Sequence, residues 1–560
     1  MQLSGAEIIV KLLERQGITQ ISGIPGGANL PLYDALKLSS IRHILARHEQ
    51  GAGFIAQGMA RASGRTSVCF ATSGPGATNL LTAIADARLD SVPVVAITGQ
   101  VPLPLIGTDA FQEIDTYGLT LPITKHNYLV RSVEELLWVI PTAFQVAASG
   151  RPGPVVIDVP KDVQLRKIEV TKWPEPGGRL ASPEPDAGAI DQVVEIINQA
   201  KRPMFYIGGG IIHARAAETV RRIAEKASIP TTATLMGLGA VPTNHPLFMG
   251  MLGMHAARFT NMALDECDLL IAAGVRFDDR ATGKVAQFCS HARIIHIDVD
   301  PSELGKIKMP FVGVEGDVGK VLGAAEDRIQ AVDRSAWLNR VCELKAAHPL
   351  IMSGSDDPLS PYGLVLQAAA SAEPDAIITT DVGPHQMWVA QSFPFSCPRQ
   401  LLTSGGLGTM GFGVPAAIGA ALAYPNRQII CFSGDGSLLM NIQELATAAE
   451  ERVNIKVVVM NNSHLGLVRQ QQELFYGSRF SASRFHTETD FPAIARGFGI
   501  EAVDLGQSDD PKKALKHALE HRGPCLINVP IPAEDKVFPM VPPGAANRDM
   551  IGGENHVDSN

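Results

Sequence analysis

The chain has 560 residues, of which 45% are hydrophobic and 19% charged, the composition of a globular protein rather than a disordered one. A formal net charge of -9 gives no basic surface for nucleic acid, and no apolar run reaches the ~20 residues that a membrane span needs. The seven cysteines are scattered without a CxxC motif, which argues against a disulfide framework or a zinc site. The chain opens with an amphipathic helical pattern and no basic leader, so we expect a cytoplasmic protein.

Short apolar runs alternate with longer helical patterns along the whole chain, which predicts parallel sheets covered by helices on both faces. In chain order these runs are TSVCFAT, VPVVAITG, PVVIDVP, PMFYIGG, DLLIAAG, RIIHIDVD, DAIITTD, QIICFSG and IKVVVMNN. Two stretches rich in Pro and Gly, residues 171–187 and 348–361, read as linkers. We therefore predict three doubly wound α/β domains, at residues 1–170, 188–345 and 362–560.

The first and third parts of the chain share an order of elements. In residues 51–100 and again in 411–462, a small-residue helix leads to a strand with Cys-Phe, a glycine turn, a helix and another apolar strand. This order suggests a duplicated domain on each side of a different one. The alternative is that any two βαβ units look this similar.

One stretch, SGDGSLLMNIQELATAAEERVNIKVVVMNN at residues 433–462, carries the strongest chemical signal. A strand over 428–433 should enter the turn Gly434-Asp435-Gly436, and a strand over 455–460 should end at Asn461-Asn462. Between them we expect one helix, with its apolar face at Leu438, Ile442, Leu445, Ala449 and Val453.

Because strands joined by a right-handed crossover end on the same sheet edge, Asp435 and Asn462 should lie close together. A carboxylate and an amide oxygen suit Mg²⁺, which commonly takes further ligands from phosphates. The helix N-terminus near Ser437 presents free N–H groups to an anion. This pattern predicts a diphosphate held through Mg²⁺ without a lysine; the alternative is a plain βαβ turn.

The GDG…NN spacing resembles the thiamine diphosphate (ThDP) binding motif. The resemblance implies that Asp435, Asn462 and the carbonyl of His464 ligate Mg²⁺. It also implies that Glu49, in RHEQGAGFIAQGMAR, is the acid that activates the aminopyrimidine, although such a residue alone is more often a helix cap or a solvated carboxylate. In SGGLGTMGFG, the Gly408 carbonyl and Met410 would grip the pyrimidine; ordinary core filling is the alternative for Met410.

Across nearly the whole chain, the sequence resembles the catalytic subunits of acetohydroxyacid synthase, also called acetolactate synthase. The matching stretches include GIPGG, SGPGATN, GTDAFQE, ITKHNYLV, SGRPGPVVIDVPKDV, GMLGMH, RFDDR, HIDVDPSELGK and VFPMVPPGAAN. The family decarboxylates pyruvate and joins the two-carbon unit to pyruvate or 2-ketobutyrate, giving 2-acetolactate or 2-aceto-2-hydroxybutyrate for branched-chain amino acids. Its active sites lie at a dimer interface, so the resemblance implies a homo-oligomer that binds ThDP, Mg²⁺ and FAD.

The resemblance also assigns residues. Arg280 would hold the carboxylate of the second ketoacid, although a salt bridge to Asp278 or Asp279 is the alternative. The flavin would be structural, because the reaction has no net redox change. Further positions expected around the substrate are Phe111, Gln112, Lys161, Met254 and Gln471. Those expected around ThDP are Gly26, Gly76, Asn79, His385, Gly436, Ser437, Gly466 and Leu467. Those expected around FAD are Arg151, Gly208, Gly209, Gly210, Leu252, Met254, His255, Arg276, Asp298 and Asp317.

Two positions depart from the family pattern. Gln471 stands where many members have a tryptophan that favours 2-ketobutyrate, so we expect weak acceptor preference. Pro384 replaces a usual glutamine beside His385, which puts one diphosphate contact in doubt. A separate small regulatory subunit is a further expected partner.

Three other functions remain as alternatives. The main one is an FAD-dependent pyruvate oxidase, which shares all three domains. A simple 2-ketoacid decarboxylase would need neither Arg280 nor FAD. A non-catalytic ThDP- or flavin-binding protein would not need Glu49 or the metal ligands.

Overall fold

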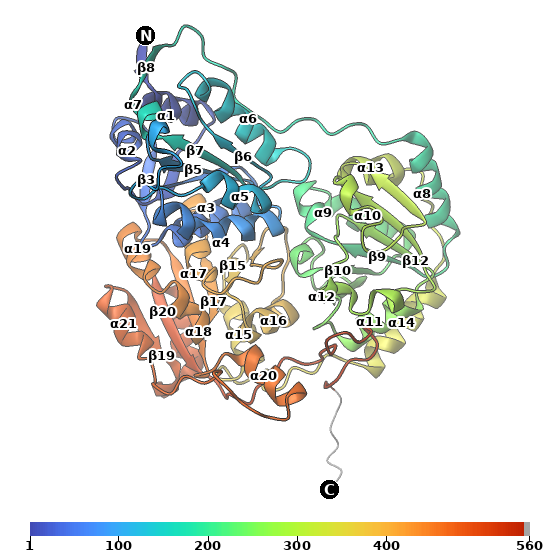
Figure 1. The fold of residues 1–560 in the computed structure, drawn as a ribbon. Helices are drawn as coiled ribbons and strands as arrows, with labels where there is room; N and C mark the ends of the chain where they lie inside the picture. Colours follow the sequence, from blue (N-terminus) through green and yellow to red (C-terminus); the bar gives the residue numbers. More distant parts are fainter. Residues whose placement is uncertain (554–560) are drawn as a thin grey trace.

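Three six-stranded sheets, all with parallel strands, form the framework of the computed structural model, which describes residues 1–553 (Figure 1). Helices flank each sheet, and the chain runs from the blue N-terminal unit to the green middle unit and then to the orange C-terminal unit. The predicted α/β fold class is confirmed, and each of the nine apolar runs forms a strand.

The N-terminal sheet has the strand order β3-β2-β4-β5-β7-β6. Its strands are β2 (Gln20–Gly23), β3 (Arg42–Leu45), β4 (Ser67–Ala71), β5 (Val94–Gln100), β6 (His126–Leu129) and β7 (Val155–Pro160). Its helices are α1 (Gly5–Arg15), α2 (Leu30–Lys37), α3 (Glu49–Ser63), α4 (Pro75–Leu89), α5 (Thr116–Thr120), α6 (Leu136–Ala148) and α7 (Lys161–Leu165). A two-stranded antiparallel ribbon, β1 (Gln2–Ser4) with β8 (Lys167–Glu169), precedes and follows this unit.

The middle sheet has the order β11-β10-β9-β12-β13-β14. Its strands are β9 (Pro203–Ile207), β10 (Thr231–Ala233), β11 (Phe248–Met251), β12 (Leu269–Ala273), β13 (Arg293–Asp298) and β14 (Val312–Glu315). Its helices are α8 (Ala187–Gln199), α9 (Gly209–His213), α10 (Ala217–Ala227), α11 (Arg258–Glu266), α12 (Asp279–Thr282), α13 (Val318–Glu326) and α14 (Ser335–Ala347). Counted along the chain, this is the order 3-2-1-4-5-6 of dinucleotide-binding folds, whose ligand site lies where the order reverses.

The C-terminal sheet has the order β16-β15-β17-β18-β20-β19. Its strands are β15 (Ile377–Thr380), β16 (Leu401–Leu402), β17 (Ile429–Gly434), β18 (Ile455–Asn461), β19 (Glu501–Asp504) and β20 (Cys525–Pro530). Its helices are α15 (Pro361–Ser371), α16 (Pro384–Ser392), α17 (Gly413–Ala423), α18 (Asp435–Met440), α19 (Glu444–Glu451), α20 (Gly466–Phe475), α21 (Phe491–Gly497) and α22 (Pro511–Glu520). The first and third sheets therefore share the order 2-1-3-4-6-5, which supports the inferred duplication over a chance likeness of βαβ units.

The prediction of a single helix after the GDG turn is wrong, because the structure has two helices there, α18 and α19. Helix α18 begins at Asp435 rather than near Ser437, and the chain leaves the helical conformation at Asn441, with φ of -139°. The Asn441 side chain donates a 2.8 Å hydrogen bond to the carbonyl of Gly411. The apolar spacing runs across this break, so periodicity alone could not reveal it.

The N- and C-terminal units meet through a close contact between α3 and α17. A Cβ on Gly58 would lie 2.2 Å from the Ala416 carbonyl oxygen, and one on Gly419 would lie 2.0 Å from that of Ile55. The two helix backbones are therefore in direct contact, and only glycine fits at these positions. Among residues 1–553, no helix combines the length and the apolar character that crossing a membrane requires.

Candidate active site

Two long helices begin beside the GDG turn at the carboxyl edge of the C-terminal sheet. A Cβ on Gly434 would lie 3.0 Å from the ring of His385 in α16, and one on Gly466, which begins α20, would lie 2.6 Å from Pro384. The short helix α18 begins at the same place, so the N-termini of three helices, with their free backbone N–H groups, lie close together. This arrangement favours an anion such as a diphosphate.

Pro384 occupies the first position of α16. A proline has no N–H there, so it offers one donor fewer to an anion at this helix end. The His385 ring is buried, and its Nε2 atom has no hydrogen-bond partner within residues 1–553. Burial lowers the pKa of His385 to about 3, so the ring is neutral. A bound diphosphate would supply the missing partner.

Asp435 has the properties expected of a metal ligand. Its side chain is 4% exposed, and its Oδ2 atom has no hydrogen-bond partner in the described chain. Burial raises its pKa to about 6 against the opposing effect of the nearby N–H groups of Gly436, Ser463 and His464. A buried carboxylate oxygen without a partner fits a hard cation such as Mg²⁺.

Asn462 lies close to Asp435, because the backbone N–H groups of the next two residues, Ser463 and His464, face the Asp435 carboxylate. Its Oδ1 atom accepts a 3.0 Å hydrogen bond from the backbone N–H of His464. This bond fixes the orientation of the amide, so its oxygen and the His464 carbonyl belong to one ordered turn. The donor set of carboxylate, amide and carbonyl oxygens fits Mg²⁺.

Glu49 is the first residue of α3, and it lies in a separate cluster in the N-terminal unit. Its side chain is 9% exposed, and its Oε2 atom accepts a 2.9 Å hydrogen bond from Asn79. A Cβ on Gly76 would lie 3.4 Å from Glu49 Oε1, and one on Gly26 would collide with Thr72. The structure thus groups four predicted residues, namely Glu49, Asn79, Gly26 and Gly76.

Glu444, at the start of α19, connects this cluster to the C-terminal unit of the same chain. Its buried carboxylate accepts hydrogen bonds from the backbone N–H groups of Arg47 and His48, each at 3.0 Å. Thr447 donates a further bond of 2.7 Å. Burial raises the pKa of Glu444, and these three donors oppose the shift. Because His48 caps α3, Glu444 fixes the backbone immediately before Glu49.

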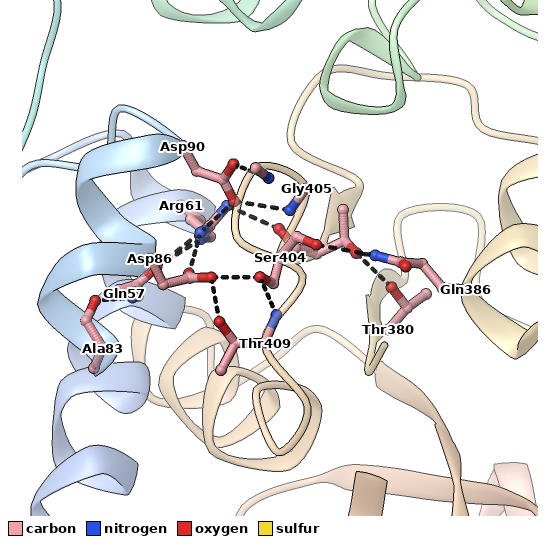
Figure 2. A network of polar contacts seen from close by, with 12 residues as sticks. Gln57, Arg61, Ala83, Asp86, Asp90, Thr380, Gln386, Ser404, Gly405 and Thr409 are labelled. Carbon is pink, nitrogen blue, oxygen red and sulfur yellow. Dashed lines mark hydrogen bonds and ion pairs between the residues drawn. The ribbon is translucent and has the colours of Figure 1, made fainter. Parts of the chain in front are cut away.

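A second polar connection between the two units holds the loop of residues 404–411 (Figure 2). Arg61, near the end of α3, lies 3.0 Å from Asp86 and 2.9 Å from Asp90, both on α4 or its C-cap. The two carboxylates in turn accept hydrogen bonds from the 404–411 loop, including those from Gly405 and Thr409. This loop contains Gly408, whose φ is 68°, and Met410.

A cavity of about 570 Å³ joins the carboxyl edge of the middle sheet to the 404–411 loop and to α20. It is lined by every residue that the family resemblance assigned to FAD. Four other residues expected near the active site also line it, namely Arg280, Gly408, Leu467 and Gln471. The volume and the apolar and charged lining suit a large cofactor.

The glycines Gly208–Gly210 have different roles in this cavity. A Cβ on Gly208 would lie 2.4 Å from the carbonyl oxygen of Gly274, and one on Gly210 would lie 2.5 Å from its Cα atom. Packing against the turn after β12 therefore explains two of the three glycines. Gly209 meets nothing closer than 3.5 Å, so it is the one whose backbone a ligand can approach.

The charged residues that line the cavity differ in whether they form ion pairs with other residues of the protein. Arg151 pairs with Glu303 at 2.6 Å, and Asp317 caps α13 and pairs with Arg179 at 3.0 Å. Burial raises the pKa of Asp298 to about 6. By contrast, the Arg276 guanidinium forms no hydrogen bond or ion pair with any residue in 1–553, so it can receive an anionic ligand. These features fit a dinucleotide such as FAD.

Arg280 lies at the mouth of this cavity. Its side chain is 66% exposed, and its nearest carboxylate, on Asp279, is 3.9 Å away. An exposed pair at this distance contributes little stability, so Arg280 is available for a substrate carboxylate. His255 is buried beside it, and burial lowers the pKa of that imidazole to about 4.

The remaining predicted residues lie apart from the cavity. Lys161 begins α7, and Gln112 has a φ of 60° in the segment after β5. The Phe111 side chain next to it is 88% exposed. No hydrogen bond or ion pair between described residues joins Glu49 to Asp435, Asn462 or His464.

Sequence analysis missed the residues that connect these groups: Arg61, Asp86, Asp90, Ser404 and Glu444. One signal was present, because Arg61 lies in a helix composed mostly of small and apolar residues. An arginine on such a helix needs a buried partner. Its partners are far away in sequence, so their identity could not be read from the pattern.

Comparisons with known proteins agree with this geometry. Residues 3–119, 190–325 and 381–529 match the N-terminal TPP binding domain, the central domain and the C-terminal TPP binding domain of thiamine pyrophosphate enzymes. The chain is 57% identical over 552 residues to the acetolactate synthase isozyme 1 large subunit of Escherichia coli, covering 98% of both chains. The chain belongs to the acetolactate synthase large-subunit family.

Two further relatives show the breadth of this family. Isozyme 2 from Escherichia coli is 45% identical over 550 residues, with 98% of this chain and 99% of that one covered. The chloroplastic acetolactate synthase 1 of Nicotiana tabacum is 45% identical over 571 residues, covering 98% and 84%. The chain is thus a ThDP-dependent enzyme of the acetolactate synthase class, for which ThDP, Mg²⁺ and FAD are the usual cofactors.

Proposed function

We propose that this acetolactate synthase decarboxylates pyruvate and transfers the two-carbon unit to a second 2-ketoacid, pyruvate or 2-ketobutyrate. The products are 2-acetolactate and 2-aceto-2-hydroxybutyrate, on the route to branched-chain amino acids. The observation that carries this proposal is the accessible Arg280 guanidinium at the mouth of the cofactor cavity. A decarboxylase that only releases an aldehyde needs no such group for a second carboxylate.

ThDP, when bound, supplies the nucleophilic carbon that accepts and decarboxylates the first ketoacid. Around it, Glu49 holds a proton at N1′ of the aminopyrimidine, and Asn79 orients that carboxylate. Asp435, Asn462 and the His464 carbonyl bind Mg²⁺. The converging helix N-termini, with Gly436, Ser437, Gly466, Leu467 and His385, hold the diphosphate.

The other residues have roles in the substrate and flavin sites. Arg280 binds the carboxylate of the acceptor, while Phe111, Gln112, Met254 and Gln471 shape its pocket and Lys161 lies at the entrance. The FAD-contacting set is Arg151, Gly208, Gly209, Gly210, Leu252, Met254, His255, Arg276, Asp298 and Asp317. The domain boundaries we propose are 1–170, 188–345 and 362–560, each range containing one of the six-stranded sheets.

We also propose a homo-oligomer in which Glu49 of one subunit serves the diphosphate site of another. Two observations support it. Among residues 1–553, no hydrogen bond or ion pair joins Glu49 to the proposed metal ligands, and the apolar Phe111 side chain is 88% exposed although it is expected to line a pocket. A large exposed apolar group beside a catalytic residue is typical of an interface. A small regulatory subunit and a cytoplasmic location complete the proposal.

The test is product analysis with purified protein, pyruvate, ThDP, Mg²⁺ and FAD, both in air and anaerobically. We expect acetolactate at similar rates in both conditions. Acetate or acetyl phosphate with peroxide, formed only in air, would identify a pyruvate oxidase instead. Acetaldehyde as the main product would show that the acceptor site does not work.

A matched pair of variants tests the acceptor site. Arg280→Gln should raise the KM for the acceptor ketoacid and increase the share of acetaldehyde. Arg258→Gln is the control, since this arginine lies in the same unit and contacts the carbonyl of Met550 instead. Gln471→Trp should raise the proportion of 2-aceto-2-hydroxybutyrate when both acceptors compete. A wild-type product ratio that already favours this compound strongly would contradict our interpretation of Gln471.

A further inference from the structure

The Arg61–Asp86–Asp90 cluster is an unusual way to join two protein units. All three side chains are buried, with side-chain exposures of 6%, 0% and 0%, and the formal charge of the cluster is -1. Burying charged groups is costly unless each is paired and hydrogen-bonded. Close apolar contact between α3 and α17 already joins the same two units. The polar cluster therefore needs another explanation.

The contacts of the cluster point to the backbone of the 404–411 loop. Asp90 accepts hydrogen bonds from the N–H groups of Gly405 at 3.0 Å and Gly406 at 2.7 Å. Arg61 donates to the Thr403 carbonyl at 2.9 Å. Two successive glycines, which have no side chains to anchor them, are thus held by one carboxylate.

Asp86 contacts the loop at two places, at its first residue and near its end. It accepts hydrogen bonds from the hydroxyl groups of Ser404 and Thr409, the latter at 3.1 Å (Figure 2). The Ser404 hydroxyl oxygen also accepts a 2.8 Å bond from the backbone N–H of Thr409. The bond between Ser404 and Thr409 closes a turn that contains Gly408, and Met410 follows it directly.

The C-terminal unit fixes the other side of the loop. Gln386, on α16, donates to the Thr403 hydroxyl at 2.7 Å and to the Ser404 carbonyl at 3.1 Å. The N–H of Gly411 donates to Asp381 at 2.8 Å. The loop is thus held by hydrogen bonds on two sides. One side contacts α16 in the C-terminal unit, and the other contacts α3 and α4 in the N-terminal unit.

We propose that the Arg61–Asp86–Asp90 cluster positions the 404–411 loop and thereby sets how tightly the aminopyrimidine end of ThDP is held. The inference rests on the proposed contacts of Gly408 and Met410 with that ring. The three cluster residues are positioning residues, because they act through the loop and do not contact the cofactor themselves.

Two variants test this proposal by binding rather than by turnover. Ser404→Ala removes one hydroxyl group, and Asp90→Asn leaves an amide oxygen that can accept from only one of the two glycine N–H groups. Affinities are measured by calorimetry on the full chain with FAD and Mg²⁺, using ThDP and, separately, inorganic diphosphate. Diphosphate reports on the helix N-termini and the metal without the pyrimidine.

For Ser404→Ala we expect the Kd of ThDP to rise about tenfold, which corresponds to about 1.4 kcal/mol, with a larger rise for Asp90→Asn. The Kd of diphosphate should stay within about twofold of wild type. Arg42→Gln is the matched control. The Arg42 side chain is 55% exposed and pairs with Glu451 between the same two units, away from the loop, so its loss should change neither affinity.

Two results would overturn the proposal: an equal loss of affinity for both ligands, which is the signature of general destabilisation, or no loss for ThDP. A Met410→Ala variant separates this inference from the proposed function. If Met410→Ala binds ThDP normally while Ser404→Ala does not, the contact of Met410 is wrong, and the positioning of the loop backbone is supported.

Discussion

Replacing Glu444 tests whether Glu49, the proposed catalytic acid, is held in place from the C-terminal unit. Glu444→Ala removes the acceptor of two buried backbone N–H groups, those of Arg47 and His48. A buried donor left without a partner costs about 1–3 kcal/mol, so the two together cost about 2–6 kcal/mol of unfolding free energy. The Thr447 hydroxyl can rotate, so its lost bond adds little.

The Glu444→Gln variant keeps an amide oxygen for the same two N–H groups. Only the charge-assisted part of each bond is lost, which amounts to about 1 kcal/mol in all. Because burial raises the pKa of Glu444, its folded state binds a proton more tightly than the unfolded chain does. Glu444 should therefore make the wild type less stable as pH rises above the ordinary glutamate pKa of about 4.3, and the loss of stability with pH should be smaller in Glu444→Gln, which lacks this contribution.

The assay combines denaturant unfolding with the rate at which the C2 proton of bound ThDP exchanges with deuterium. Under the proposed role of Glu49, that exchange depends on the placement of this residue, which follows His48 directly. We expect Glu444→Ala to slow it at least about tenfold and Glu444→Gln to change it less than about threefold.

Glu450→Ala is the matched control for this series. Glu450 lies on the same helix, α19, and contacts the side chain of Arg47, but it is 56% exposed. Exposed ion pairs contribute about 0–1 kcal/mol, so both measurements should remain near wild type. If Glu444→Ala exchanged the proton as fast as Glu450→Ala, Glu444 would have no part in placing Glu49.

Three further predictions concern other parts of the molecule. Gly58→Ala places a Cβ within 2.2 Å of a backbone oxygen and should cost about 1–3 kcal/mol of unfolding free energy. Gly323 is exposed on α13, and its Cβ would meet no atom within 4 Å, so Gly323→Ala should stabilise the protein by about 0.5–1 kcal/mol. Thermal unfolding compares the two variants, and equal shifts would contradict the contact at Gly58. Asp435→Asn should raise the Mg²⁺ concentration needed for half-maximal ThDP binding at least about tenfold, and an unchanged Mg²⁺ titration would rule out its role as ligand. Burial raises the pKa of Asp158 to about 7, above its unfolded value of about 3.9, so stability should fall by up to about 1.4 kcal/mol per pH unit between pH 4 and 7; unfolding midpoints at pH 5 and 7 that do not differ would contradict this.

The strands and the chemistry of the C-terminal site were predictable because local patterns encode them. A parallel sheet buried on both faces requires continuous apolar strands, and all nine such runs are strands. Asp435 and Asn462 follow neighbouring strands, β17 and β18, so the crossover rule alone placed them together. The glycines of the proposed flavin site could also be recognised in the sequence, but the sequence did not show which of them pack against the protein and which a ligand can approach.

The elements and the residues that follow each strand can be predicted from the sequence, because both depend mostly on interactions within about 30 residues. Which distant groups meet depends on how the units pack. Glu444 reaches the backbone before Glu49 across nearly 400 positions, and Asp86 and Asp90 reach Ser404 and Gly405 across more than 300. The break at Asn441 also depends on packing between elements, although its partner, the carbonyl of Gly411, is only 30 residues away in the sequence. Contacts of this kind satisfy buried polar groups that pair only after the units have packed, so no local pattern records them.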